Sequence, residues 1–259
     1  MKIRMYQVDA FTDKIFGGNA AAVCPLEAWL PDAVMQAIAE ENNLSETAFF
    51  VRAGDRFDIR WFTPKIEIAL AGHPTLATAH VIFRHLGYDK PEIVFQSKSG
   101  ELRAARSGDV IQLDFPGYEA KPVKAPKALV KGLRAKPVEV LLGRDYTAVF
   151  EKEADILALD PDFAELAKLD CLGIIVTAPG DRSDFVSRFF APRAGILEDP
   201  VTGSAHTLLI PYWAKRLGKP VLHAYQVSKR RGEIFCEQRG DRVLIGGRAV
   251  TFFEGEIEV

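Results

Sequence analysis

The order of apolar and polar residues along the chain predicts two similar series of short strands. Runs rich in β-branched and aromatic residues are bounded by Gly, Pro and polar turns, a pattern typical of strands. In the first series these runs are residues 47–51, 57–62, 93–96, 101–105 and 110–115, and in the second 173–177, 185–190, 221–227, 233–237 and 243–245. A proline follows the 57–62 run and another follows the 185–190 run, and each should end its strand.

One apolar helix is expected within each series. The first should begin at Pro74 and end near Gly87, and the second should run from Pro200 to Gly218. Proline suits the first helical position, and glycine suits the C-cap. Both stretches are apolar nearly all round, so each helix should be buried inside its own strands. Pro211, inside the second stretch, predicts a kink or a break.

Three pairs of segments repeat in the same order at a nearly constant separation. Residues 54–56, 60–64 and 72–80 are echoed by 180–182, 188–192 and 198–206, and the 60–64 and 188–192 segments read RWFTP and RFFAP. Such a series is difficult to explain by chance and indicates an internal duplication. We therefore expect an α+β fold of two pseudo-symmetric, barrel-like halves, each a mostly antiparallel curved sheet around a central helix.

The two halves should meet in a segment rich in Pro and Lys. Residues 116–131 have this composition, which is typical of a linker. We place the boundary near Gly117, with an N-terminal half of residues 1–117 and a C-terminal half of residues 118–259.

Composition and charge narrow the classes of partner. The chain has 259 residues, of which 48% are hydrophobic and 26% charged, as in an ordinary globular protein. Lys and Arg number 33 against 35 Asp and Glu, so no global field attracts nucleic acid or an anionic membrane. The N-terminus lacks the apolar stretch of a signal peptide, and no run approaches the ~18 apolar residues of a membrane span. We expect a cytoplasmic protein that binds neither nucleic acid nor membranes.

No residue pattern indicates a metal or a cofactor. The three cysteines have no paired spacing and should be reduced and mostly buried: Cys24, Cys171 and Cys236. His80 and His206 fall within the predicted helices and are expected to be core histidines rather than metal ligands. Gly17-Gly18-Asn19 lacks the lysine of a phosphate loop and the dinucleotide spacing, so it predicts a tight turn.

We expect the active-site residues at the starts of the two helices. A helix start presents unpaired backbone N–H groups and a positive dipole end. If the halves face one another, both starts can bind a carboxylate or a developing oxyanion in one cleft. The residues that would surround such a ligand are Gly72 and His73 before Pro74, Asp199 before Pro200, and Gly203 and Ser204 in the following turn.

A simpler interpretation is open for each of these residues. Asp199 is a preferred helix N-cap, and His73 could merely fill a turn. The duplication argues against this, because it places an ionisable group at the same point of both copies.

Glu46, in the turn before an apolar strand, would ordinarily be a solvated carboxylate. Its counterpart in the second copy is Leu172, so the halves differ chemically and only one supplies this acid/base group.

Four segments together resemble the phenazine biosynthesis-like PhzF family, over essentially the whole chain: residues 18–19, 44–49, 71–75 and 199–206. That family is similar in fold to diaminopimelate epimerase, with two pseudo-symmetric α/β barrels, each around a central helix, and an active site between them. The sequence leaves the oligomeric state open. Because homodimers are common among relatives, a homodimer is one expectation.

The resemblance also implies roles for individual residues. Glu46 would be the general acid/base, and His73 and Asp199 would position the substrate and assist proton movement. The substrate-binding residues would be Asn19, Ser45, Gly72, Gly203 and Ser204. The best-known reaction of the family isomerises trans-2,3-dihydro-3-hydroxyanthranilate by moving a proton, without cofactor or metal. We expect an isomerase of the same kind, acting on a small cyclic or conjugated carboxylic acid.

Two other classes of function stay open. A racemase or epimerase of a small amino or hydroxy acid would need a second base, and only His73 or Asp199 could serve. Neither helix start carries a cysteine, which disfavours a two-thiol racemase. A non-catalytic binding protein on the same fold predicts that Glu46, His73 and Asp199 do not converge.

Overall fold

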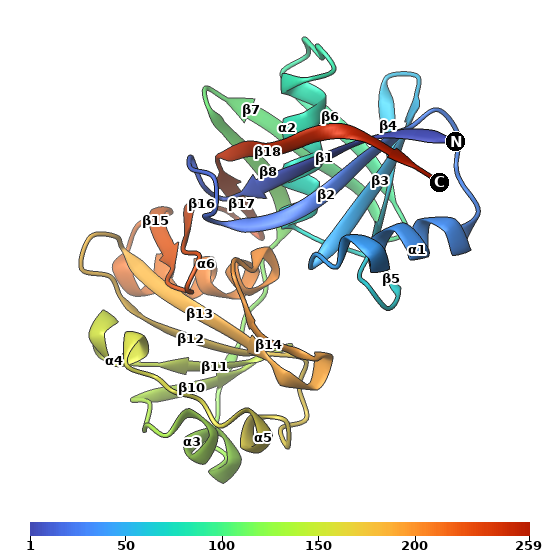
Figure 1. Ribbon diagram of the computed structural model, residues 1–259. Helices are drawn as coiled ribbons and strands as arrows, with labels where there is room; N and C mark the ends of the chain where they lie inside the picture. The colour runs from blue at the N-terminus through green and yellow to red at the C-terminus, as the bar shows by residue number, and fades with distance from the viewer. The chain divides into compact units, whose positions relative to one another are not determined.

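The computed structural model describes residues 1–259, which divide into two compact units. Unit 1 comprises Met1–Asp114 together with Gly246–Val259, and unit 2 comprises Phe115–Ile245 (Figure 1). This division differs from the expected halves of 1–117 and 118–259 at the C-terminal end. The last strand, Ala249–Glu258, returns to pair antiparallel with the first strand, Lys2–Ala10, and so belongs to unit 1.

Unit 1 is a mixed sheet with two helices. Its strands are β1 (Lys2–Ala10), β2 (Asn19–Leu26), β3 (Glu46–Ala53), β4 (Arg56–Phe62), β5 (Glu67–Ile68), β6 (Glu92–Ser97), β7 (Gly100–Ser107), most of β8 (Val110–Pro116) and β18 (Ala249–Glu258). Its helices are α1 (Asp32–Asn42) and α2 (His73–Arg84). The pairing order is β18-β1-β2-β3-β4-β6-β7-β8, with β5 also on β4. The β2–β3 and β4–β6 pairs are parallel because α1 and α2 provide the crossovers that parallel strands require.

The pairing order and strand directions of unit 2 match those of the first seven strands in the order of unit 1. Its strands are β9 (Lys121–Pro122), β10 (Glu139–Leu142), β11 (Tyr146–Val149), β12 (Ile174–Pro179), β13 (Phe185–Ala191), β14 (Ile196–Asp199), β15 (Val221–Gln226), β16 (Gly232–Arg239) and most of β17 (Arg242–Gly247). Its helices are α3 (Lys127–Leu133), α4 (Glu153–Leu157), α5 (Phe163–Leu166), the 3₁₀ turn η1 (Pro192–Ala194) and α6 (Gly203–Leu217). The order is β9-β10-β11-β12-β13-β15-β16 with β14 on β13, and the β11–β12 and β13–β15 pairs are parallel.

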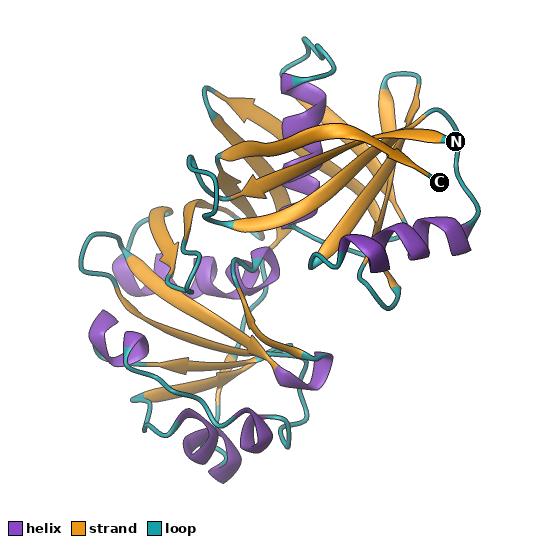
Figure 2. Cartoon of the chain, in the orientation of Figure 1, coloured by secondary structure: helices purple, strands orange, loops and turns teal.

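Helix α2 is the buried helix that the apolar pattern predicts. It begins at His73, with Gly72 as the N-cap and Pro74 in the first turn. It packs against β1, β2, β3 and β18, and Figures 1 and 2 show it crossing behind the strands of unit 1. Side chains on nearly every side of the helix are buried, from His73 to Phe83. The helix ends at Arg84, slightly before the expected position.

Helix α6 begins at Gly203, so the predicted start at Pro200 is wrong. The residues up to Asp199 form β14, which pairs with β13, and Thr202 at the N-cap has extended backbone angles of φ −117° and ψ 98°. Asp199 is therefore the end of a strand rather than an N-cap. The C-terminal end agrees with the prediction, since Gly218 caps the helix in the left-handed conformation.

Pro211 was predicted to kink or break the helix, and of these two the break does not occur, because the helix continues through Pro211. Proline has no N–H, which leaves the carbonyl one turn earlier, at Thr207, without its helical donor. The backbone N–H of Tyr118 donates to this Thr207 carbonyl at 2.9 Å. A donor from outside the helix therefore replaces the missing one.

The segment 116–131 is only partly a linker. It contains β9 and the beginning of α3, whose Leu129 and Leu133 are fully buried in the core cluster of unit 2.

All three cysteines are free thiols, with Cys24 and Cys236 buried and Cys171 half-buried, as expected. None of the helices combines the length and the apolar character needed to cross a lipid bilayer.

Candidate active site

Glu46 and His73 lie side by side within unit 1. Glu46 is the first residue of β3 and His73 the first residue of α2. Glu46 Oε2 is 3.1 Å from His73 Nε2, and the two side chains are only 13% and 7% exposed. A carboxylate and an imidazole at this distance can exchange a proton or share it with a bound molecule.

The imidazole is held from its other side by Asn19. Asn19 opens β2, which runs parallel to β3 with Ala21 opposite Glu46. Asn19 Nδ2 lies 3.2 Å from His73 Nδ1, so the ring spans from the amide to the Glu46 carboxylate. Burial lowers the pKa of His73 to about 3, against a smaller opposing effect of a hydrogen bond with the Ala20 backbone. His73 is therefore a neutral imidazole near pH 7.

The tight turn expected at Gly17-Gly18-Asn19 determines where Asn19 lies. Gly18 has φ +57°, and a Cβ atom there would lie 2.0 Å from the Ala10 carbonyl oxygen. Only glycine fits this close approach. The same loop is tied to β1, because the Phe16 N–H donates to Asp9 Oδ2 at 2.8 Å.

Two further predicted substrate-binding residues flank the Glu46–His73 pair along the chain. Ser45 is half-buried immediately before β3, and Gly72 is half-buried at the start of α2. The Gly72 carbonyl accepts the first hydrogen bond of the helix, from the Leu76 N–H at 3.1 Å.

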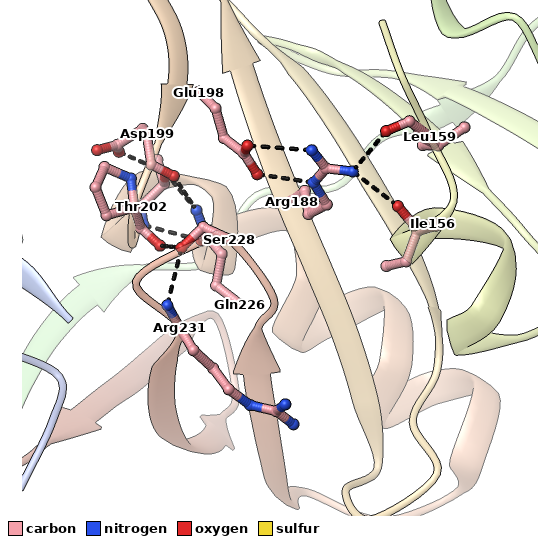
Figure 3. Close-up of polar contacts among 10 residues, drawn as sticks. Ile156, Leu159, Arg188, Glu198, Asp199, Thr202, Gln226, Ser228 and Arg231 are labelled. Atoms are coloured by element: carbon pink, nitrogen blue, oxygen red, sulfur yellow. Dashed lines mark hydrogen bonds and ion pairs between the residues drawn. The ribbon is translucent and has the colours of Figure 1, made fainter. Parts of the chain in front are cut away.

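Asp199 is the centre of a second polar cluster, which lies within unit 2. The Thr202 hydroxyl donates to Asp199 Oδ2 at 2.5 Å (Figure 3). Gln226 Nε2 donates to the Asp199 carbonyl at 2.8 Å, and Gln226 Oε1 accepts from the Thr202 N–H at 2.9 Å. Gln226 is fully buried, so both the backbone and the carboxylate of Asp199 are held by internal partners.

Gly203 and Ser204 form the first turn of α6, directly after this cluster. His206, one turn into the helix, is fully buried, and its Nδ1 lies 2.8 Å from the Thr202 carbonyl oxygen. Burial lowers the pKa of His206 to about 4, so it is a neutral core histidine, as expected. Its counterpart His80 is half-buried against Thr251 Oγ1 at 3.0 Å, and burial lowers its pKa to about 4 as well.

Sequence reasoning missed Thr202 and Gln226 as partners of Asp199. Thr202 lies inside the echoed segment 198–206, so that segment could have drawn attention to it. Gln226 ends β15 and follows Asp199 at a long distance along the chain, and no local pattern marks it. It is a buried polar side chain, which only the folded structure reveals.

Cys24 and Cys236 are poorly placed for thiol chemistry. Burial raises the pKa of Cys24 to about 12, and neither Cys24 nor Cys236 is at a helix start. No group of three or more His, Cys, Asp or Glu side chains has the arrangement of a metal site.

Comparison with known proteins gives the same family as the motifs. The sequence model of the phenazine biosynthesis-like (PhzC-PhzF) family matches residues 8–255. An uncharacterized isomerase from Pseudomonas aeruginosa is 50% identical over 259 residues, covering 100% of both chains. The crystal structure of a PhzF family protein from Enterococcus faecalis matches with a TM-score of 0.98 at 48% identity, again covering 100% of both chains.

The likeness extends more distantly to racemases and epimerases. A hydroxyproline epimerase from Agrobacterium vitis has a TM-score of 0.62 at 9% identity, covering 99% of this chain and 92% of that one, which shows a shared fold alone. Because the family match and the isomerase relative both span nearly the whole chain, the protein is an isomerase that belongs to the phenazine biosynthesis-like PhzF family.

Proposed function

We propose that the protein is a cofactor-independent isomerase that moves a proton between two carbons of a small cyclic or conjugated carboxylic acid. Glu46 is the general acid/base. The observation that carries this proposal is the 3.1 Å approach of the Glu46 carboxylate to the neutral His73 imidazole in a buried setting. A positioned carboxylate of this kind takes up a proton from one carbon and returns it to another.

His73 assists because it is neutral. A histidinium cation would hold Glu46 in an ion pair, whereas a neutral imidazole can donate or accept a single hydrogen bond as the proton moves. Asn19, 3.2 Å from His73 Nδ1, keeps the ring turned toward Glu46.

Backbone groups at the helix starts would bind the substrate carboxylate. Gly72 at the start of α2 and Gly203 and Ser204 at the start of α6 offer N–H groups and a positive dipole end. Ser45 is proposed as a further hydrogen-bonding partner. Asp199, itself an anion, would contact an amino or hydroxyl group of the substrate rather than its carboxylate.

Replacing Glu46 tests the proposal. The protein is incubated in D₂O with a panel of anthranilate-like and other unsaturated carboxylic acids, and deuterium uptake is followed by mass spectrometry. Glu46→Gln should keep the fold and lower the exchange rate by about 10²-fold or more, because the amide cannot carry the proton. The matched control, Glu40→Gln on the exposed side of α1, should exchange at the wild-type rate. Exchange by Glu46→Gln at the wild-type rate would show that another residue carries the proton.

A racemase or epimerase is the second candidate, which the fold shared with the hydroxyproline epimerase favours. It needs a second base on the opposite face of the substrate, which His73 or Asp199 would supply. Chiral chromatography of amino and hydroxy acids after incubation separates the two candidates. Inversion of a stereocentre supports the epimerase, and a proton shift without inversion supports the isomerase.

Two expectations about the whole protein complete the proposal. We infer that the two units arose by duplication, which the matched pairing orders and the echoed segments support. A homodimer is the proposed assembly, because homodimers are common in this family, and sedimentation velocity at micromolar protein concentration would measure it.

A further inference from the structure

Two arginines at corresponding positions of the two units each bind a glutamate with two hydrogen bonds. In unit 1, Arg60 Nε and Nη2 donate to the two carboxylate oxygens of Glu67, both at 2.8 Å. In unit 2, Arg188 Nε and Nη2 donate to the two carboxylate oxygens of Glu198 at 2.7 and 3.1 Å (Figure 3). We call these pairs the Arg–Glu clamps. Both arginines lie in the echoed segments of the sequence, on β4 and β13.

Each clamp holds the short strand that leads into a residue of the proposed site. Glu198 directly precedes Asp199 at the end of β14, and Glu67 lies in β5, shortly before His73. Strand β14 is weakly held by its backbone, because only Asp199 and Ile196 have partners on β13 and the register shifts between them. The Arg188–Glu198 pair adds a side-chain anchor to this sparse backbone pairing.

The unit 2 clamp provides a rigid anchor. Arg188 Nη1 also donates to the carbonyl oxygens of Ile156 and Leu159, at 2.9 and 3.1 Å, so the guanidinium is tied to the body of the unit. It lies 5.0 Å from the centre of the Phe190 ring. The Glu198 carboxylate thus has a fixed place, and Asp199 follows it by one residue.

Net stability does not by itself explain the forked geometry of the clamps. Their side chains are only 13% to 23% exposed, and removing such charges from water offsets most of their attraction. Apolar residues of similar size often serve stability as well or better. A bidentate fork between planar groups instead contributes defined geometry. The presence of the same device in both units points to positioning.

We propose that Arg188 and Glu198 are positioning residues that fix Asp199 for substrate handling, and that Arg60 and Glu67 do the same for the segment that leads to His73. The role in catalysis rests on the proposed function. Glu198 anchors the backbone of Asp199, and Gln226 and Thr202 then hold its carbonyl and carboxylate. Breaking the clamp should therefore loosen residues 199–202 while the rest of unit 2 stays intact.

The first test measures local order and needs no substrate. The double variant Arg188→Met/Glu198→Met removes both charges together, so no unpaired buried charge is left. Amide hydrogen exchange is followed by NMR at Thr202, whose N–H is bonded to Gln226. We expect exchange at Thr202 to become at least about tenfold faster, through local opening, with β12 amides unchanged.

The matched control is the Arg239→Met/Glu237→Met double variant. This pair has the same bidentate geometry on β16, at 2.7 and 3.1 Å, but its side chains are 60% and 28% exposed. It should leave Thr202 unchanged. If the clamp variant unfolds, Arg188→Lys takes its place. Lysine keeps the positive charge but cannot make the two parallel hydrogen bonds, so the Thr202 amide should again exchange faster. Wild-type protection at Thr202 in a folded clamp variant would overturn the proposal.

The second test asks whether the clamp acts through Asp199. In the deuterium-uptake assay, the clamp variant should lose about tenfold in rate, because small misplacements of a substrate-handling group are costly. In an Asp199→Asn background the same change should cause little further loss, since two residues acting as one unit are not additive. Additive losses would assign the clamp a merely structural role. If no acid exchanges even with the wild-type protein, the proposed function fails, while the Thr202 measurement still decides the positioning claim.

Discussion

At the level of single residues, the backbone conformation of Gly18 sets the position of Asn19 and, through it, the orientation of His73. Gly18 adopts φ +57°, and the Ala10 carbonyl oxygen lies 2.0 Å from where a Cβ atom would be, so the turn excludes any side chain. Asn19 then opens β2 with its amide directed at His73 Nδ1. A backbone constraint at one position thus determines the environment of an imidazole on a different element.

Gly18→Ala tests this constraint. We expect a loss of more than about 2 kcal/mol in the free energy of unfolding, because the added Cβ meets a carbonyl oxygen in addition to the ~1 kcal/mol strain of a left-handed alanine. Gly54→Ala is the matched control, since Gly54 has φ +66° and open space around it, and it should show the strain alone. Urea unfolding measures both, and equal losses in the two variants would contradict the steric argument.

At the level of elements, α6 shows how tertiary contacts override a local signal. Pro211 should kink or break the helix, yet the helix is continuous, and the Tyr118 N–H takes the place of the missing donor at the Thr207 carbonyl. Residues at the start of unit 2 therefore stabilise the middle of its central helix. The predicted helix end, in contrast, depends only on Gly218 and its left-handed conformation, and the structure confirms it.

Pro211→Ala should weaken the contact between Tyr118 and Thr207. The new N–H competes for the Thr207 carbonyl, so the amide of Tyr118 should exchange with solvent several-fold faster. Pro31→Ala, at the exposed start of α1 in unit 1, is the control and should leave Tyr118 unchanged. Unaltered protection of Tyr118 in Pro211→Ala would mean that its hydrogen bond does not depend on the proline.

At the level of the whole molecule, both units bury histidines that are neutral in the folded state. Burial lowers the pKa of His73 to about 3, and of His80 and His206 to about 4. In the unfolded chain each would titrate near 6.5. Between about pH 6.5 and 4 the unfolded state therefore binds more protons, so stability must fall as the pH is lowered through this range.

Mild acid should accordingly destabilise the protein. We expect each of the three histidines to lower the free energy of unfolding by up to about 1.4 kcal/mol per pH unit below pH 6.5. His206→Asn, which keeps an N–H donor for the Thr202 carbonyl, should reduce the slope. Urea unfolding at pH 7, 6 and 5 measures it. A slope identical to that of the wild-type protein would show that His206 does not bind its proton on unfolding.

Sequence alone determined the elements whose signals are local. The strands β4 and β13 were predicted from apolar runs ended by proline, and the start of α2 and the end of α6 from Pro74 and Gly218. These signals depend on the backbone angles and on the burial of nearby residues, so a short window contains them. The family motifs also propose roles for Glu46, His73 and Asp199 without reference to their neighbours, and these roles stay predictions.

The tertiary structure alone decided how distant segments meet. It shows that β18 pairs with β1 in unit 1, that α6 begins at Gly203 and that this helix continues through Pro211. It also placed Glu46 against His73 and buried Gln226 beside Asp199. Each of these outcomes depends on a hydrogen bond or a strand pairing between residues far apart in the chain. Such contacts form only when the whole chain folds, so no local pattern of residues encodes them.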